Sequence, residues 1–365
     1  MASTFGKKIV TTIFGESHGR GIGVVIDGLP PGEEIDMEEL HGFLKRRAPG
    51  QSDYTTQRKE EDMPEFLSGL LGNTLTGSPV SAIIRNKDQR SSDYKNILDI
   101  PRPSHADYTA YIKYGGNMDM RGGGPFSGRI TAPLCVAGGI ALQILKRRGV
   151  HIAAHLLSAG EIEDCSWDLV TTQVEDLEAL KSKDFPTISN ESGRKMKAYL
   201  GELRQAGDSI GGLIECMAIG LPVGLGEPNY GGFESVLSAA IFSVPGVRGI
   251  SFGTGFPAAK MKGSEHNDEF EILGGQIRTK TNHGGGVTGG ITNGMPIRFH
   301  VAMKPTSSIS KPQESFSLTE NIEKNLVIEG RHDPCIAVRA VPVIEAACAL
   351  VILDLWEDYY GNKRY

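Results

Sequence analysis

The alternation of apolar and polar residues predicts a chain of mixed strands and helices. Residues 8–14 and 21–26 are short runs rich in β-branched side chains, which are typical of strands. From Asp36 to Arg47 the apolar residues recur at helical spacing, and Asp36 with Glu39 forms a plausible capping box for this helix. The same criteria predict strands at 79–85, 150–158 and 210–221, and helices at 130–148, 193–206, 234–243 and 339–356.

These elements do not follow the regular strand–helix alternation of a doubly wound parallel sheet. We therefore expect an α+β fold, built as a layered sandwich of antiparallel β-sheets and helices. Neither an internal repeat nor a low-complexity linker divides the sequence, so residues 1–365 are predicted to form a single domain.

A glycine-rich segment, Arg121 to Arg129, leads into the predicted helix at 130–148. The N-terminus of a helix offers unpaired N–H groups and the positive end of the helix dipole, so this junction is a natural cradle for an anion. The chain contains 47 glycines without a Gly-X-Y period, which indicates many turns and close backbone approaches and excludes a collagen-like structure.

The formal net charge of −6 argues against broad binding to nucleic acid, which requires a clustered basic face. A local basic cluster nevertheless stands out, formed by Lys45, Arg46 and Arg47 with Arg58 and Lys59 further on. Spacing alone fits two interpretations equally: a site for a small anion, or a solvated surface.

Two features favour a soluble cytoplasmic protein without membrane contact. The N-terminus has no apolar segment of signal-peptide length, and the longest apolar run, 346–353, is far shorter than the ~20 residues that span a bilayer. The five cysteines form no CxxC pair and are odd in number, so we expect reduced thiols rather than a disulfide framework.

Two short motif matches are rejected on their context. Residues 15–19 fit the G-x-S-x-G nucleophile elbow of serine hydrolases, but the β-branched run that follows does not predict the helix that an elbow requires. Residues 284–289 fit the dinucleotide fingerprint, yet the continuation Gly290 to Pro296 cannot open a helix.

The histidines divide into two groups. His151 and His155 fall in a predicted apolar strand and are expected in the core. Loop histidines on a rigid scaffold are better candidates for chemistry, because they can meet a ligand. Four histidines lie in predicted loops beside glycine, proline or aspartate: His18, His105, His283 and His332.

Two segments, Arg102–Asp107 and Arg331–Cys335, each combine an arginine, a histidine and an aspartate. A fixed cation beside a titratable group suits the elimination of an anionic leaving group from a small acid. A metal site is the competing interpretation. We expect no metal, because no HxxxH or HxH pair exists and the acids neighbouring each histidine should point away from it.

Taken together, five segments in order along the chain resemble the chorismate synthase family. They cover much of the chain and are far more specific jointly than any one motif. The segments are GESHG followed by IGVVIDGLP, RPSHADYT, TNHGGGVTGGITNGMPI, the KPTSSIS run at 304–310, and RHDPCIAVRAVPVIEA.

The resemblance implies antiparallel sheets flanking a helical layer, a homotetramer, and a reaction of the shikimate pathway. In that reaction phosphate is eliminated from 5-enolpyruvylshikimate 3-phosphate to give chorismate. The family requires reduced FMN although the step involves no net redox change, so the cofactor supplies the difficult chemistry. NADPH is a possible reductant, and the sequence leaves open whether this chain reduces its own flavin.

The resemblance also implies roles for individual residues. His18 would protonate or stabilise the reduced flavin, His105 would act as general acid near the departing phosphate, and Asp333 would help the flavin N5 act as base. Arginines suit phosphate and carboxylate oxygens through bidentate contacts. Substrate contacts are assigned to Ser17, Arg47, Arg58, Arg121 and Arg129, and flavin contacts to Ser127, Pro245, Gly246, Gly289, Lys304, Thr306, Ser308 and Arg331.

Some positions depart from the pattern common in the family. Asp53 stands where many members have arginine, Leu134 also replaces a common arginine, and Pro125, Phe126 and Ile130 replace polar residues near the presumed cofactor. These changes leave open a flavin-binding oligomer that has lost activity, and the GESHG segment leaves open a serine hydrolase that uses Ser17.

Overall fold

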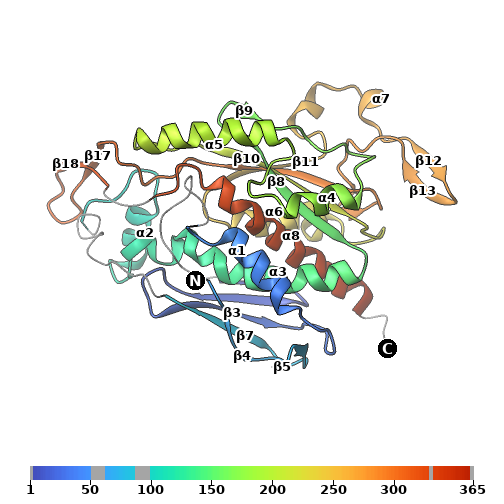
Figure 1. The fold of residues 1–365 in the computed structure, drawn as a ribbon, viewed down its shortest axis with the longest axis horizontal. Coiled ribbons are helices and arrows are strands. Elements are labelled where there is room, and N and C mark those ends of the chain that lie inside the picture. The colour runs from blue at the N-terminus through green and yellow to red at the C-terminus, as the bar shows by residue number, and fades with distance from the viewer. Residues whose placement is uncertain (1–2, 51–61, 87–98, 329–331, 362–365) are drawn as a thin grey trace.

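Two five-stranded antiparallel sheets form the framework of the protein (Figure 1). The computed structural model describes residues 3–50, 62–86, 99–328 and 332–361. The first sheet has the order β1-β2-β3-β7-β4, with strands Thr4–Phe5, Val10–Gly15, Gly21–Asp27, Val80–Arg85 and Glu65–Ser68. The second has the order β11-β16-β10-β8-β9, with strands Val247–Phe252, Ile297–Met303, Gly212–Ile219, His151–Ala159 and Ile162–Glu163.

A helical layer separates the two sheets (Figure 1). It contains α1 (Met37–Arg47), α3 (Thr131–Arg147), α6 (Phe233–Phe242) and α8 (Ala337–Tyr360). Gly138 and Gly139 of α3 permit close packing, because a Cβ on Gly138 would lie 2.2 Å from the Cβ of Ala346 in α8. A Cβ on Gly139 would lie 2.5 Å from Leu40 Cδ1 in α1. The two glycines therefore let α3 contact a different helix on each side.

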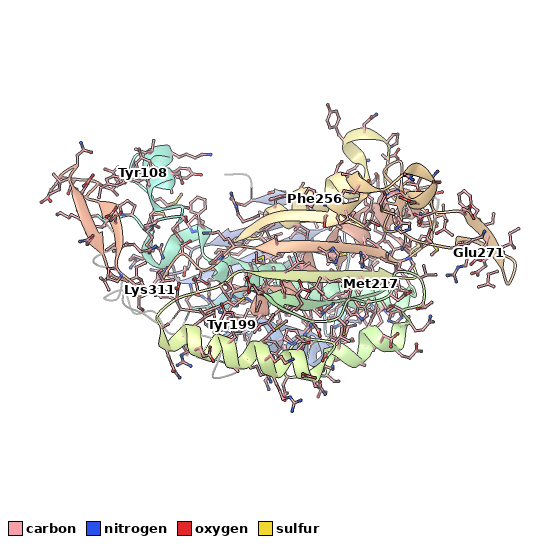
Figure 2. The ribbon with its side chains drawn as sticks, turned by 90° about the horizontal axis from the view of Figure 1, so that it is seen from above. Tyr108, Tyr199, Met217, Phe256, Glu271 and Lys311 are labelled. Atoms are coloured by element: carbon pink, nitrogen blue, oxygen red, sulfur yellow. The ribbon has the colours of Figure 1, made fainter. Side chains whose placement is uncertain are left out.

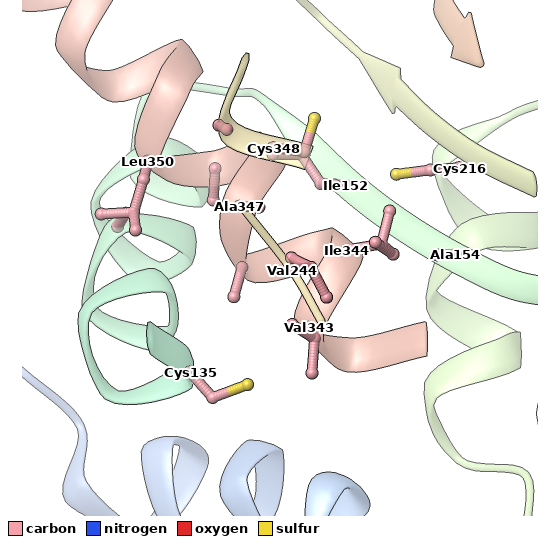
Figure 3. Packing of buried hydrophobic residues seen from close by; sticks show 14 of the residues in the cluster. Cys135, Ile152, Ala154, Cys216, Val244, Val343, Ile344, Ala347, Cys348 and Leu350 are labelled. Atoms are coloured by element: carbon pink, nitrogen blue, oxygen red, sulfur yellow. The ribbon is translucent and has the colours of Figure 1, made fainter. Parts of the chain in front are cut away.

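One hydrophobic cluster joins the sheets to these helices. In Figure 3, Ile344 and Cys348 of α8 lie on the side of Ile152 and Ala154 of β8, while Ala347 and Leu350 lie toward α3. All five cysteines are free thiols. Residues 128–147 are apolar and long enough to cross a membrane, but 78% of their most apolar window is buried, so this segment is a core helix.

The second sheet carries helices α4 (Val174–Lys181) and α5 (Asn190–Gln205) on its outer face (Figure 1). A polar cluster is buried on that side, where His155 Nε2 lies 2.8 Å from Glu215 Oε2 and His300 Nε2 lies 3.2 Å from Glu215 Oε1. Burial alone would raise the pKa of Glu215, but hydrogen bonds with the two histidines lower it to about 2. His155 is fully buried, as predicted for a core histidine.

Smaller elements project from the two ends of the molecule (Figures 1 and 2). Helix α2 (Asp107–Tyr114) lies at one end with the hairpin β17–β18, and α7 (Gly263–His266) lies at the other with the hairpin β12–β13. The remaining short strands form the hairpins β5–β6 and β14–β15. The hairpin strands are Leu70–Leu71 with Thr74–Leu75, Phe270–Leu273 with Gln276–Thr279, Val287–Thr288 with Ile291–Thr292, and Gln313–Phe316 with Glu323–Leu326.

The α+β sandwich expected from the sequence is confirmed, and each predicted strand and helix is present with shifts of a few residues at its ends. Asp36 caps α1 by accepting hydrogen bonds from the backbone N–H groups of Glu38 and Glu39. Both motif rejections are also confirmed. Strand β2 turns directly into its antiparallel partner β3, and residues 287–292 form a hairpin where a dinucleotide fingerprint would begin a helix.

Candidate active site

A cavity of about 550 Å³ opens where several segments distant in sequence converge. Its wall combines the C-terminal end of α1, the glycine-rich loop before α3, the loop before α2, the segment after β16 and the first turns of α8. This volume lies within the usual range for small-molecule sites.

The glycine-rich loop brings the two histidine segments together. Gly122, Gly123 and Gly124 have φ angles of +64°, +94° and +52°, which only glycine adopts readily. A Cβ on Gly122 would lie 2.2 Å from His18 Nδ1, and one on Gly123 would lie 3.2 Å from His105 Nε2. Adjacent glycines therefore contact both histidines, and side chains at these positions would push the rings away.

His105 forms a tight unit with Asp107 and Arg102. Its Nδ1 lies 2.6 Å from Asp107 Oδ1, while Arg102 Nε and Nη2 donate to the same carboxylate at 2.7 and 2.8 Å. So short a contact with a carboxylate favours the tautomer in which Nδ1 carries the proton and donates it to Asp107, and Arg102 Nη2 lies 3.1 Å from the same nitrogen. The prediction that neighbouring acids point away from the histidine is wrong here, because Asp107 begins helix α2 and turns back toward the ring.

Burial is the largest influence on His105 and lowers its pKa, with Asp107 acting in the opposite direction and Arg102 adding to the lowering. The ring is therefore neutral at pH 7 in the protein alone, with the Nδ1 proton held by Asp107. Its Nε2 faces Gly123, the neighbour of Gly122, and both His105 and Gly122 line the cavity.

A second buried unit joins Asp62 to two cavity arginines. One oxygen of Asp62 accepts a hydrogen bond from Arg47 Nη1 and the other accepts one from Arg129 Nη1. Arg47 also donates from Nε to Thr131 Oγ1 at 3.1 Å. The sequence argument missed Asp62, because it lies in a charged stretch with no pattern that distinguishes one acid from the next.

The basic cluster at 45–47 divides between two environments. Arg47 lines the cavity, whereas Arg46 forms a bidentate ion pair with Glu345 of α8 at 2.7 and 2.8 Å. One of the two arginines thus belongs to the candidate site, and the other ties α1 to α8.

Asp333 lies beside Arg339, another residue that the sequence argument missed. Arg339 Nη1 donates to Asp333 Oδ2 at 2.7 Å, and Arg339 Nε donates to the carbonyl of Arg47 at 3.0 Å. Arg339 is the third residue of α8 and belongs to the segment RHDPCIAVRAVPVIEA, but only the fold reveals its link to Asp333. Thr306 Oγ1 donates to the Asp333 carbonyl at 2.8 Å.

The segment after β16 is tied to the His105 loop. Lys304 Nζ donates to the Ser104 carbonyl at 2.6 Å, and Arg102 Nη1 donates to Ser308 Oγ at 3.2 Å. Ser104 has a φ of +57°, which is uncommon for a residue other than glycine. Such strained backbone persists where surrounding contacts hold it, often at functional sites.

The cavity gathers most of the residues singled out from the sequence. His18 and Ser17 lie one step behind its wall, against Gly122, and Arg121 pairs with Asp119 outside the wall. Gly289 lies in the β14–β15 turn, away from the cavity wall, while Arg58 and Arg331 fall outside the described residues. The wall contains Arg47, His105, Ser127, Arg129, Pro245, Gly246, Lys304, Thr306, Ser308 and Asp333.

The residues that depart from the family pattern also divide between the cavity wall and other places. Pro125 and Phe126 line the cavity, whereas Ile130 and Leu134 pack against the hydrophobic core. Asp53 lies outside the described residues. The glycine-rich loop therefore presents apolar side chains to the cavity at positions where many family members have polar ones.

The serine hydrolase alternative is wrong. Ser17 is buried, and the described residues offer its hydroxyl no hydrogen-bond partner that could act as a base. Within the described residues there is also no group of three or more histidine, cysteine or acidic side chains placed to hold a metal ion.

Cations, hydroxyl groups and a histidine with a defined tautomer converge on one cavity with an apolar side. These features define an enzyme that binds a small polyanion and transfers protons while anionic charge develops. Comparison with known proteins identifies the particular enzyme class: residues 9–356 match the chorismate synthase family, and the chain belongs to that family.

Known chorismate synthases are similar to this chain over nearly its full length. The chain is 44% identical to the chorismate synthase of Lancefieldella parvula, with 97% of this chain and 96% of the relative covered. It is 43% identical to that of Korarchaeum cryptofilum, with 96% of each covered. A solved structure described as chorismate synthase superimposes with a TM-score of 0.77 at 27% identity, covering 98% of this chain and 94% of that one.

The chain is accordingly a phosphate-eliminating lyase with chorismate synthase activity in the shikimate pathway. The family uses reduced FMN. The function that the sequence segments implied is thereby confirmed.

Proposed function

We propose that the elimination of phosphate from 5-enolpyruvylshikimate 3-phosphate takes place in the cavity beside His105. The observation that supports this best is the fixed arrangement of His105, Asp107 and Arg102 at the cavity wall. Arg47 and Arg129, in the same wall, bind the anionic groups of the substrate. In this proposal Ser17 and Arg121 support the site from behind Gly122 and beside it.

His105 acts as the general acid in this proposal. Asp107 holds the Nδ1 proton, so the second proton binds at Nε2, on the side of Gly123. Burial keeps the ring neutral in the protein alone, and a phosphate dianion beside Nε2 favours the charged imidazolium. When the substrate binds, the ring therefore takes up a proton from solvent, which it can then donate to the departing phosphate.

The residues of the cavity fit a flat anionic cofactor. Val244, Pro245 and Ile336 provide an apolar wall, and Lys304 provides a cation at its edge. A Cβ on Gly246, whose φ is +95°, would lie 2.6 Å from Ile336 Cδ1, so glycine keeps the cradle narrow. Reduced FMN bound here supplies transient electron density to the substrate. We assign its binding to Ser127, Pro245, Gly246, Lys304, Thr306 and Ser308, with Gly289 and Arg331 assigned by resemblance alone.

Two further residues complete the proposed mechanism. His18 approaches the cavity edge through Gly122 and holds a proton next to the flavin. Asp333, held by Arg339, would help the N5 of a bound flavin act as base. Gly122 matters for the first role, because its missing side chain leaves the ring in contact with the loop.

The experiment is anaerobic turnover of 5-enolpyruvylshikimate 3-phosphate with reduced FMN, measured as phosphate release. His105→Ala and Asp333→Ala should each reduce turnover by roughly 10²-fold or more. His151→Ala is the matched control, because His151 lies on β8 beside Glu178 and outside the cavity wall. Unchanged turnover in His105→Ala would remove His105 from the mechanism. In a parallel reaction NADPH replaces the chemical reductant, and turnover there would assign flavin reduction to this chain.

We also propose that the chain works as a homotetramer in the cytoplasm, with residues 1–365 as one catalytic domain. The hairpin β12–β13 supports assembly, because it projects from the body (Figure 2) and carries exposed apolar side chains. Phe270, Ile272 and Ile277 are 76%, 77% and 71% exposed. An apolar patch of this kind on a projecting arm marks a contact surface. The free cysteines fit a reducing compartment.

A further inference from the structure

The carboxylate of Asp62 lies between two guanidinium groups of the cavity wall. One oxygen accepts from Arg47 Nη1 and the other accepts from Arg129 Nη1, and the Asp62 side chain is fully buried. Both arginines line the cavity, but Asp62 does not. Asp62 therefore contacts the groups that face a ligand without facing the ligand itself.

The backbone at Asp62 indicates that these contacts hold it in place. Its φ is +52°, in the left-handed region that aspartate enters only occasionally. Of the non-glycine residues with positive φ in the described chain, two flank the cavity, Asp62 and Ser104. Strain of this kind persists where surrounding interactions determine the conformation.

The charges explain why the position matters. Two buried guanidinium groups close to each other repel. A carboxylate between them compensates their charge and accepts a charge-assisted hydrogen bond from each. Burial alone would raise the pKa of Asp62, but Arg47 and Arg129 hold it below its usual value, so the group stays ionised.

Neutral contacts complete the orientation of the two arginines. Arg47 Nη2 donates to the Gly128 carbonyl at 3.1 Å, and Arg129 Nε donates to Asn86 Oδ1 at 3.1 Å. Protein groups thus hold each guanidinium at two or more of its nitrogens. The plane of each group is set before any ligand arrives.

We propose that Asp62 is a positioning residue for the anionic substrate, which it serves by bridging Arg47 and Arg129 into a preformed phosphate clamp. This inference rests on the proposed assignment of both arginines to substrate binding. Preorganisation lowers the cost of binding, because the arginine side chains lose their freedom during folding rather than at the encounter.

Two opposing effects make the idea testable. If Asp62 acted only through its charge, removing that charge would make the clamp more positive and tighten anion binding. If Asp62 positions the arginines, removing it weakens anion binding despite the added positive charge. The sign of the change in affinity separates the two.

The experiment compares Asp62→Asn and Asp62→Glu in the full-length protein. Asn keeps the shape without the charge, and Glu keeps the charge but displaces the carboxylate. Both variants should raise the KM for 5-enolpyruvylshikimate 3-phosphate about tenfold or more, the effect of one lost charge-assisted hydrogen bond, with kcat changed by less than about threefold. Binding of inorganic phosphate, measured by calorimetry, should weaken in parallel.

Asp354→Asn is the matched control. Asp354 is a buried carboxylate that accepts hydrogen bonds from the backbone N–H groups of Lys7, Lys8 and Ile9, and it lies outside the cavity wall. That variant should lower the melting temperature and leave KM unchanged, as a purely structural role predicts.

Each outcome decides the proposal. Tighter phosphate binding in Asp62→Asn, or an unchanged KM in Asp62→Glu, would overturn it, and either variant suffices if the other does not fold. Arg129→Gln tests the underlying assignment separately. If its KM is unchanged, Arg129 does not bind substrate, and the proposed function fails at this residue whatever Asp62 does.

Discussion

Replacing Gly122 with alanine tests whether the glycine-rich loop determines the position of His18. Gly122 has a φ of +64°, and an added Cβ would lie 2.2 Å from both Nδ1 and Cε1 of His18 and 2.8 Å from Ser17 Oγ. Non-bonded heavy atoms prefer separations of roughly 3.5 Å or more. The imidazole must therefore move by more than about 1 Å, or the loop must open.

The size of the effect follows from two contributions. A left-handed alanine costs about 1–2 kcal/mol, and overpacking a filled site costs about 1–3 kcal/mol more. This is a large part of the typical 5–15 kcal/mol of total stability, yet it leaves a folded protein at moderate temperature. A displacement of about 1 Å in a reacting group costs about 10²-fold in rate, so we expect at least this loss in kcat.

The assay is anaerobic phosphate release with reduced FMN, combined with thermal unfolding. Gly72→Ala is the matched control, because Gly72 has a φ of +60° and an added Cβ would meet nothing within 4 Å. It should lower stability by the left-handed contribution alone and keep full turnover. A folded Gly122→Ala protein with the wild-type kcat would refute the idea that the loop positions His18.

Three further changes have defined outcomes. Asp107→Asn removes the charged acceptor for the Nδ1 proton of His105, and turnover should fall roughly 10²- to 10⁴-fold in phosphate-release kinetics; the melting temperature should fall as well, because the buried Arg102 loses its ionised partner. Because the folded-state pKa of Glu215 is about 2, below the ordinary 4.5, its ionised form stabilises the fold above pH 4.5 and this is lost as the pH falls toward 2. Denaturant unfolding across that range should lose at most roughly 3 kcal/mol through this group, and Glu215→Gln should flatten the dependence. Aspartate at both Ile272 and Ile277 should shift the protein to smaller assemblies in light scattering, and unchanged mass would remove the β12–β13 hairpin from the interface.

Local patterns in the sequence predicted most of the strands and helices. The β-branched runs that became β2 and β3, and the helical spacing after Asp36, report short-range preferences that tertiary packing reinforced rather than overrode. The chemistry of the site was also accessible in part, because His105 and Asp333 lie in segments where an arginine, a histidine and an acid occur together. Residue types that lie within a few positions of one another can be recognised from the sequence before the fold is known.

Which groups meet was decided only by the tertiary structure. Asp62 reaches Arg129 across 67 positions, and Arg339 reaches the carbonyl of Arg47 across 292. No local pattern records such pairs, because each depends on how the sheets and helices pack. The contact between His105 and Asp107 joins residues close in sequence, but only the structure revealed it. The turn into α2 directs the carboxylate back to the ring.

The sequence by itself therefore determined the elements, the family and the residue types of the active site. The three-dimensional fold decided which arginines line the cavity, which carboxylates hold them, and which nitrogen of His105 contacts Asp107. The physical reason is range: hydrophobic periodicity and capping act within a few residues, whereas buried ion pairs form between segments that only the folded core brings together.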